Sequence, residues 1–163
     1  MSPANVIFIV GRNQSMGTSF GDLPRITAVT RAIQSAIGMF PNAVYYAYAE
    51  YPSRIGCSGT NSCCVSSDSW YSVGLLNENN DSKLSCDPGP QNSSCLVMTD
   101  GRPITPTLAQ TAQWLGPGTT NERYAILFAD GPPGGCPGDN ATDACNAAVM
   151  SITNLRQSAG VSS

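Results

Sequence analysis

The stretch Val6-Ile-Phe-Ile-Val10, followed at once by Gly11-Arg-Asn-Gln-Ser15-Met16, decides the fold of this chain. A short apolar run that ends in polar turn residues is typical of a strand buried on both faces. A second such run, Tyr124 to Ala129 (YAILFA), ends in Asp130-Gly131. Since polar residues at the carboxyl ends of parallel strands form the ligand sites of open α/β sheets, the two turns predict one shared site.

Helix and strand patterns fill the sequence around these two runs. Ile26, Val29, Ile33 and Ile37 recur at helical spacing and predict a helix from Pro24 to about Gly38. An aromatic strand, Ala43 to Tyr51, follows it, and strand, helix and strand in this order favour a parallel sheet. Further predictions are a helix capped by Thr105 and ending at Gly116, a strand over 123–129, and a last helix opened by Asp139 or Asn140. The expected fold class is therefore α/β, a three-layer αβα sandwich around a mostly parallel sheet.

The length of 163 residues predicts one domain, residues 1–163. A Cys/Ser/Asn/Gly-rich insertion interrupts it at about residues 53–94, with one short strand candidate around Trp70 to Leu76. The last residues, Gln157 to Ser163, indicate a helix end that leads into another strand. We expect that the C-terminal part of the domain is missing, which leaves Tyr124 to Ala129 as an open sheet edge for a tail or a partner chain to complete.

Seven cysteines are many for a reducing compartment, and they favour a secreted or cell-surface protein with disulfide-stapled loops. Their positions are Cys57, Cys63, Cys64, Cys86, Cys95, Cys136 and Cys145. Cys136 with Cys145 is the first expectation for a pair, although free thiols at these two positions remain an alternative. A zinc site is the minor alternative, because the chain has no histidine and the cysteines lack C-x-x-C spacing.

Composition excludes several classes of function. The net charge is −3, the isoelectric point is near 4.6 and Lys83 is the only lysine, so no basic surface for nucleic acid is expected. No apolar run approaches the ~20 residues of a transmembrane helix. The absence of histidine excludes imidazole-based triads, and no phosphate-binding loop is present. We therefore expect no enzyme activity.

The same residues carry a resemblance to a known family. The strand and turn over 6–17 (VIFIVGRNQSMG), the turn over 100–103 (DGRP) and the strand and turn over 126–133 (ILFADGPP) resemble, in this order, the motifs of von Willebrand factor A domains. The segment 48–57 (YAEYPSRIGC) is most similar to cysteine-bearing surface members from gliding bacteria. The resemblance implies a sheet similar to that of dinucleotide-binding folds. At the edge of this sheet the family holds a divalent ion in a metal-ion-dependent adhesion site.

Carried over residue by residue, that site is degenerate in this chain. The family's first aspartate falls on Gly11, its first serine on Asn13 and its second serine on Ser15. Its threonine falls on Arg102 and its last aspartate on Asp130. Because a carboxylate is lost and a fixed cation is gained, we expect no metal cofactor. The hypothesis is that the Arg102 guanidinium replaces the ion as the partner of Asp130.

Two alternatives stay open for this site. Arg102 points into solvent and Asp130 caps its own turn, or a shifted register puts Thr105 in the threonine position. The shifted register predicts a weak Mg²⁺ or Ca²⁺ site made of Asn13, Ser15, Thr105 and Asp130.

The function expected is a non-enzymatic adhesion or protein-binding module whose ligand site is Asn13, Ser15, Arg102 and Asp130. The alternatives are a structural subunit that a neighbour completes through the sheet edge, and a weak cation-dependent adhesin.

Overall fold

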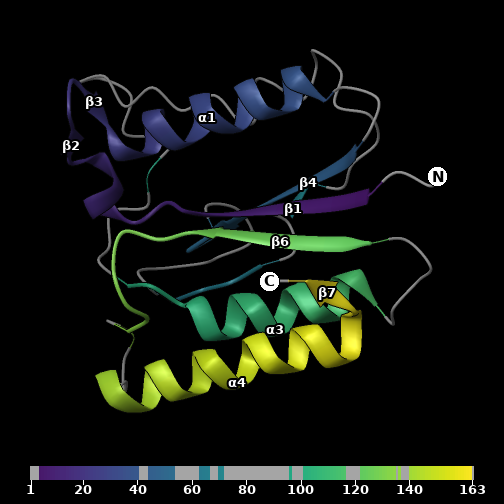
Figure 1. Cartoon of the computed structure of the whole chain (residues 1–163). Coiled ribbons are helices and arrows are strands. Elements are labelled where there is room, and N and C mark those ends of the chain that lie inside the picture. Colours follow the sequence, from purple (N-terminus) through teal and green to yellow (C-terminus); the bar gives the residue numbers. More distant parts are fainter. Residues whose placement is uncertain are drawn as a thin grey trace.

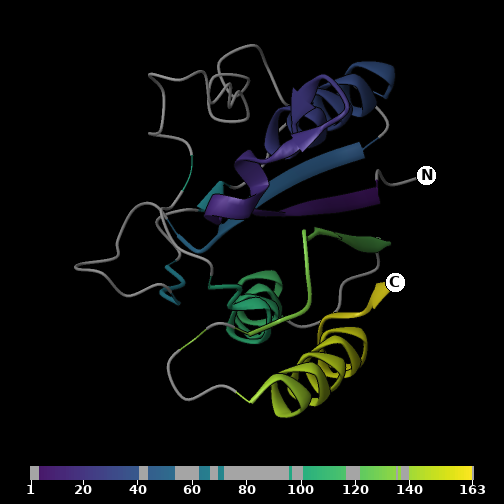
Figure 2. The ribbon, with the colours of Figure 1, turned by 90° about the vertical axis from the view of Figure 1, so that its left-hand side faces the viewer.

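A computed structural model describes residues 4–40, 44–53, 63–66, 70–71, 96, 101–116, 122–134, 136 and 140–162. Within them a five-stranded sheet has the strand order β5-β4-β1-β6-β7. Its strands are β1 (Ala4–Gly11), β4 (Val44–Tyr51), β5 (Trp70–Tyr71), β6 (Arg123–Phe128) and β7 (Val161–Ser162). Helix α1 (Arg25–Met39) covers one face, and α3 (Ile104–Leu115) and α4 (Ala141–Ala159) cover the other (Figures 1 and 2). An α/β fold with helices on both sides of the sheet is thereby confirmed.

The apolar strands bury both of their faces, which divides the core in two. Side chains alternate along β1, so that Ile7 and Ile9 pack with α3 and α4 while Phe8 and Val10 pack with α1. Strand β4 follows the same rule: Ala47, Ala49 and Tyr51 lie on the side of α3 and α4, whereas Tyr46 and Tyr48 lie on the side of α1. Strands β4 and β6 both pair in parallel with β1, as the chain order predicts, whereas β5 pairs antiparallel with β4.

The structure corrects several predicted elements. Helix α3 begins at Ile104 after Pro103, so Thr105 lies in the first turn and is not the cap. Its hydroxyl donates to the Ala144 carbonyl of α4 at 3.4 Å instead. Asn140 does cap α4, because its side chain accepts a hydrogen bond from the Thr142 amide.

Two further segments differ from the sequence prediction in extent. The stretch expected to be a loop after β1 contains a small antiparallel pair, β2 (Ser19–Phe20) and β3 (Leu23–Pro24). The strand candidate at 70–76 is described only over β5, and the rest of it lies outside the described residues.

The expected Cys136–Cys145 disulfide is wrong. Cys136 pairs with Cys63, 73 positions away in the sequence, and Cys145 is an exposed free thiol on α4. Cys64 is disulfide-bonded as well. Most of the insertion, with Cys57, Cys86 and Cys95, lies outside the described residues.

None of the helices in the described part of the chain combines the length and the apolar character needed to cross a bilayer.

Candidate functional site

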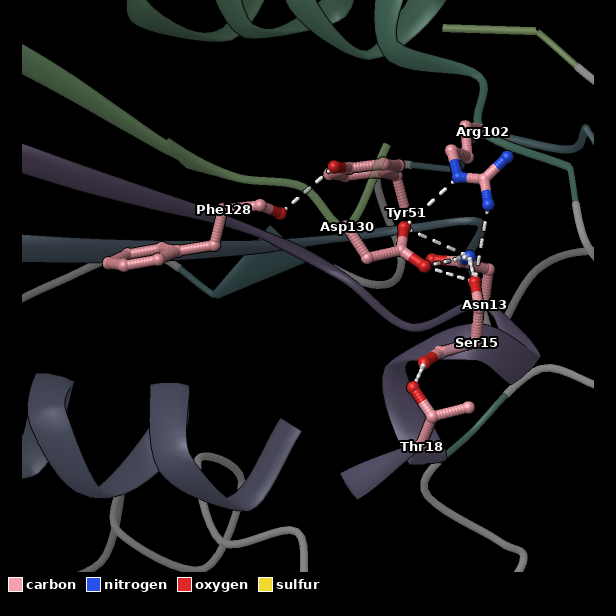
Figure 3. Close-up of polar contacts among 7 residues, drawn as sticks. All are labelled: Asn13, Ser15, Thr18, Tyr51, Arg102, Phe128 and Asp130. Atoms are coloured by element: carbon pink, nitrogen blue, oxygen red, sulfur yellow. Dashed lines mark hydrogen bonds and ion pairs between the residues drawn. The ribbon is translucent and has the colours of Figure 1, made fainter. Parts of the chain in front are cut away.

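The site is built where the carboxyl ends of three parallel strands meet. β1 lies between β4 and β6, and its register pairs Gly11 with Tyr51 and Val10 with Phe128. The chain therefore leaves all three strands at the same edge of the sheet. Asn13 and Ser15 follow β1, and a short 3-10 helix, Gln14–Gly17, holds them there. Asp130 follows β6, and Arg102 reaches the same point from the turn before α3 (Figure 3).

The Asp130 carboxylate is the centre of this cluster. Asn13 Nδ2 donates to both of its oxygens at 3.2 Å, and the Ser15 hydroxyl donates to Oδ2. Arg102 Nε completes the set at 3.0 Å from Oδ1. Figure 3 shows the donors converging on the carboxylate from two sides, Asn13 and Ser15 from the turn after β1 and Arg102 from the turn before α3. A carboxylate with this many donors is held in one orientation, because its lone pairs are largely in use.

Ser15 and Arg102 are also connected to each other. Asn13 Nδ2 lies 2.5 Å from Ser15 Oγ, and Arg102 Nη2 lies 3.3 Å from the same oxygen. The Asp130 side chain is 1% exposed and that of Arg102 is 23% exposed. The charged carboxylate is thus buried, and the guanidinium is the part of the cluster that reaches the surface.

This environment sets the ionisation of Asp130. Burial by itself raises the pKa of the carboxyl group. The hydrogen bonds from Ser15, Arg102 and Asn13, together with the charge of Arg102, outweigh burial and bring the pKa below its ordinary value. Asp130 is therefore an anion at neutral pH, paired with a fixed cation.

Two glycines leave the room that the cluster needs. A Cβ at Gly11 would lie 3.2 Å from Asn13 Oδ1 and 3.3 Å from the Tyr51 hydroxyl. A Cβ at Gly131 would lie 3.1 Å from Arg102 Nε, so the guanidinium packs directly on this backbone. Any larger residue at either position pushes on a member of the site.

A second, fully buried ion pair supports the turn from behind, and the sequence reasoning missed it. Arg12 Nη2 lies 3.1 Å from Glu50 Oε1, with both side chains 0% exposed, and it also contacts the Tyr48 hydroxyl. The signal was present, since Glu50 is the one charge inside an apolar strand and Arg12 follows the neighbouring strand. This pair ties the start of the site turn to β4.

Tyr51 joins the turn to β6 in a similar way. Its hydroxyl donates to the Phe128 carbonyl at 2.9 Å, close to where β6 ends. Burial first, and then the nearby Asp130 charge, raise the pKa of Tyr51, with Arg102 acting in the opposite direction. The hydroxyl therefore stays protonated and acts as a structural donor.

The structure thus brings Asn13, Ser15, Arg102 and Asp130 together, and it places Arg102 against Asp130 rather than in solvent. It does not bring in Thr105, whose hydroxyl contacts α4. A ligand for these four residues stays a prediction.

Solved structures of a larger protein contain a similar fold. The fold is similar to part of a bacterial pilus adhesin. The open conformation of the pilus adhesin SpaC from Lactobacillus rhamnosus GG is 19% identical over 82% of this chain, with a TM-score of 0.54. A second structure of SpaC is also 19% identical over 82% of the chain, with a TM-score of 0.53. The chain matches only 15% and 16% of the length of these adhesin chains, and at this identity the likeness shows the fold alone. No protein-family model and no curated protein matches the sequence.

Proposed function

We propose that this chain is a non-enzymatic adhesion module that binds a protein partner outside the cell. The partner would contact the sheet edge formed by Asn13, Ser15, Arg102 and Asp130. The observation that carries the proposal is the cluster itself, a buried carboxylate held by three side chains at the carboxyl ends of β1 and β6. Crevices at this edge are where open α/β sheets bind their ligands.

The fold and the disulfide agree with this function. A fold shared with part of a pilus adhesin supports an adhesive role, and the Cys63–Cys136 bridge supports an oxidising, extracytoplasmic location. The motif resemblance assigns the chain to the von Willebrand factor A family as part of the same proposal. SpaC is far longer than this chain, so the partner of the whole adhesin is not carried over.

We further infer that the site works without a bound metal ion. Hard cations need several oxygen ligands. In this cluster Ser15 Oγ and the Asp130 carboxylate are engaged with each other and with the donors of Asn13 and Arg102, and the remaining side-chain oxygen, Asn13 Oδ1, lies beside Gly11. Asn13 turns an amide N–H toward the carboxylate, and the guanidinium lies where a cation would otherwise balance the charge. Gly11 has no side chain to add a ligand. The donor set therefore does not fit Mg²⁺ or Ca²⁺, and Arg102 takes over the role of the ion.

The experiment separates the site, the metal and the fold. The disulfide-intact chain is immobilised and tested for binding to a panel of extracellular-matrix proteins and mucin, with and without EDTA. The variant Arg102→Met keeps the length of the side chain, and Arg31→Met on the exposed face of α1 is its matched control.

The proposal expects binding that EDTA does not change, that Arg102→Met lowers at least tenfold, and that Arg31→Met leaves intact. Binding lost in EDTA, or micromolar Mg²⁺ or Ca²⁺ affinity by calorimetry, overturns the metal-free site. Binding that Arg102→Met does not affect overturns the location of the site.

A further inference from the structure

The backbone of Arg102 is held by the loop that follows β6. Its amide donates to the Gly134 carbonyl at 2.8 Å, and the Gly134 amide donates back to the Arg102 carbonyl at 3.3 Å. This antiparallel bridge lies outside the strands of the sheet. Asp130 and Gly131, which contact the guanidinium, belong to the same loop. The loop therefore positions both ends of the arginine, the backbone at Gly134 and the side chain at Asp130.

The Cys63–Cys136 disulfide anchors this loop close to the bridge, because Cys136 follows shortly after Gly134. A cavity of about 360 Å³ lies beside the bridge, and Cys63, Arg102, Gly134 and Cys136 all contribute to its wall. On that side the bridge faces open space, so a covalent bond rather than close packing anchors it there.

The other half of the disulfide is attached to the end of β4. Ser53, which is buried and lies just past this strand, donates its amide to the Cys64 carbonyl at 2.9 Å. The Ser53 hydroxyl accepts a hydrogen bond from the Ser66 amide at 2.7 Å. The segment 63–66 thus lies against the end of β4, at the carboxyl edge of the sheet. Through the disulfide, this edge holds the loop that positions Arg102.

The disulfide is also accessible to a reductant. Cys63 and Cys136 are both partly exposed, and the cavity of about 360 Å³ lies next to them. Because a disulfide is opened by a thiolate that attacks one of its sulfur atoms, access to the sulfur is a condition for the reaction. This disulfide meets that condition.

We propose that the Cys63–Cys136 disulfide is a redox switch for the proposed adhesion site. A dithiol attacks one sulfur, the S–S bond breaks, and the other cysteine leaves as a thiolate that takes up a proton. The second thiol of the reductant then displaces the first cysteine, so the dithiol is oxidised to a cyclic disulfide and both cysteines are reduced to thiols. The released loop no longer pairs Gly134 with Arg102, and the guanidinium loses its fixed position on Asp130. The effect on binding rests on the proposed function, whereas the effect on Arg102 does not.

The test opens this disulfide alone, because Cys64 is disulfide-bonded as well and also reacts with a reductant. The double variant Cys63→Ser/Cys136→Ser is compared with the native chain. The matched control is Cys145→Ser, which removes the exposed free thiol of α4 and leaves the disulfide in place.

Three measurements are made on each protein. Amide hydrogen exchange follows the Arg102 and Gly134 amides, with the amides of β1 as the reference for an intact fold. Carboxyl NMR measures the pKa of Asp130. Binding to the panel of extracellular proteins is repeated for both variants, and for the native chain before and after treatment with dithiothreitol.

In the double variant the Arg102 and Gly134 amides should exchange at least tenfold faster, while β1 keeps its protection. The pKa of Asp130 should rise toward its ordinary value near 3.8, since the hydrogen bond and the charge of Arg102 help to lower it in the native chain. Binding should fall at least tenfold in the double variant and in the dithiothreitol-treated chain, and reoxidation should restore it in the latter. Cys145→Ser should match the native chain in every measurement.

Unchanged exchange of the Arg102 and Gly134 amides, or an unchanged pKa of Asp130, overturns the switch. Loss of protection throughout β1 also overturns it, because the disulfide would then hold the whole fold rather than the site. A partner that binds the double variant as tightly as the native chain has the same consequence. If the native chain binds no partner, the proposed function fails, and the exchange and pKa measurements still decide whether the disulfide positions Arg102.

Discussion

Replacing Arg102 by methionine tests the central physical claim, that a guanidinium stabilises the buried Asp130 carboxylate. The substitution keeps most of the side-chain stem and removes the donor 3.0 Å from Asp130 Oδ1. A hydrogen bond to a charged group contributes about 1.5–3 kcal/mol, and breaking a fully buried ion pair costs about 3–5 kcal/mol. Arg102 is 23% exposed, so water can reach the carboxylate after the change. We therefore expect a loss of about 2 kcal/mol in unfolding free energy, within the range for a hydrogen bond to a charged group.

The assay is thermal and urea unfolding followed by circular dichroism at pH 7, without reductant. For a chain of this size, about 2 kcal/mol corresponds to a fall in Tm of roughly 4–8 °C. Arg31→Met is the control and should change Tm by less than about 2 °C, since most exposed substitutions lie within ~0.5 kcal/mol. A double-mutant cycle with Asp130→Asn should give a coupling energy of at least about 1 kcal/mol.

Acid should remove the stabilisation that the Arg102–Asp130 pair contributes. The pKa of Asp130 is lowered in the folded state, so its stabilisation is present above its ordinary value near 3.8 and is lost as the pH falls through the lowered value. The stability gap between the native chain and Arg102→Met should therefore narrow below about pH 4. An Arg102→Met variant as stable as the native chain at pH 7, or a cycle that is additive, would refute the reasoning.

Three other outcomes follow from the described contacts. Gly131→Ala should destabilise the chain by about 1–3 kcal/mol in urea unfolding, because the new Cβ pushes on the guanidinium; an unchanged midpoint would contradict this packing. Glu50→Gln should cost about 3–5 kcal/mol by the same measurement, since it leaves Arg12 buried without its carboxylate; a loss under 1 kcal/mol would argue against the buried pair. Iodoacetamide added without reductant should label Cys145, and peptide mapping should recover Cys63 linked to Cys136; a Cys136–Cys145 peptide would contradict the pairing.

Local patterns in the sequence were sufficient to predict the long strands and helices of the fold. The apolar run of β1 and the apolar periodicity of α1 each extend over a few neighbouring residues, so both can be recognised without the rest of the chain. The order strand, helix, strand then favoured a parallel sheet, and the polar turns after β1 and β6 pointed to one shared edge. These expectations agree with the observed sheet.

Two of the errors concern partners that are distant in the sequence. Cys136 was expected to pair with a cysteine nine positions away, whereas Cys63 lies 73 positions away and within bonding distance. The chain around Cys63 must first be brought beside the loop after β6, and no local pattern encodes that approach. The buried Arg12–Glu50 pair was missed for the same reason, because only the pairing of β1 with β4 brings these two residues together.

The sequence by itself determined the long strands and helices and which polar residues leave the strands at one edge, because those properties depend on local periodicity. Only the tertiary structure decided that Arg102 lies on Asp130, since Arg102 precedes α3 and approaches the edge from outside the strands. It also decided that Cys63 lies within bonding distance of Cys136. Both depend on how the packed layers position segments far apart in the chain.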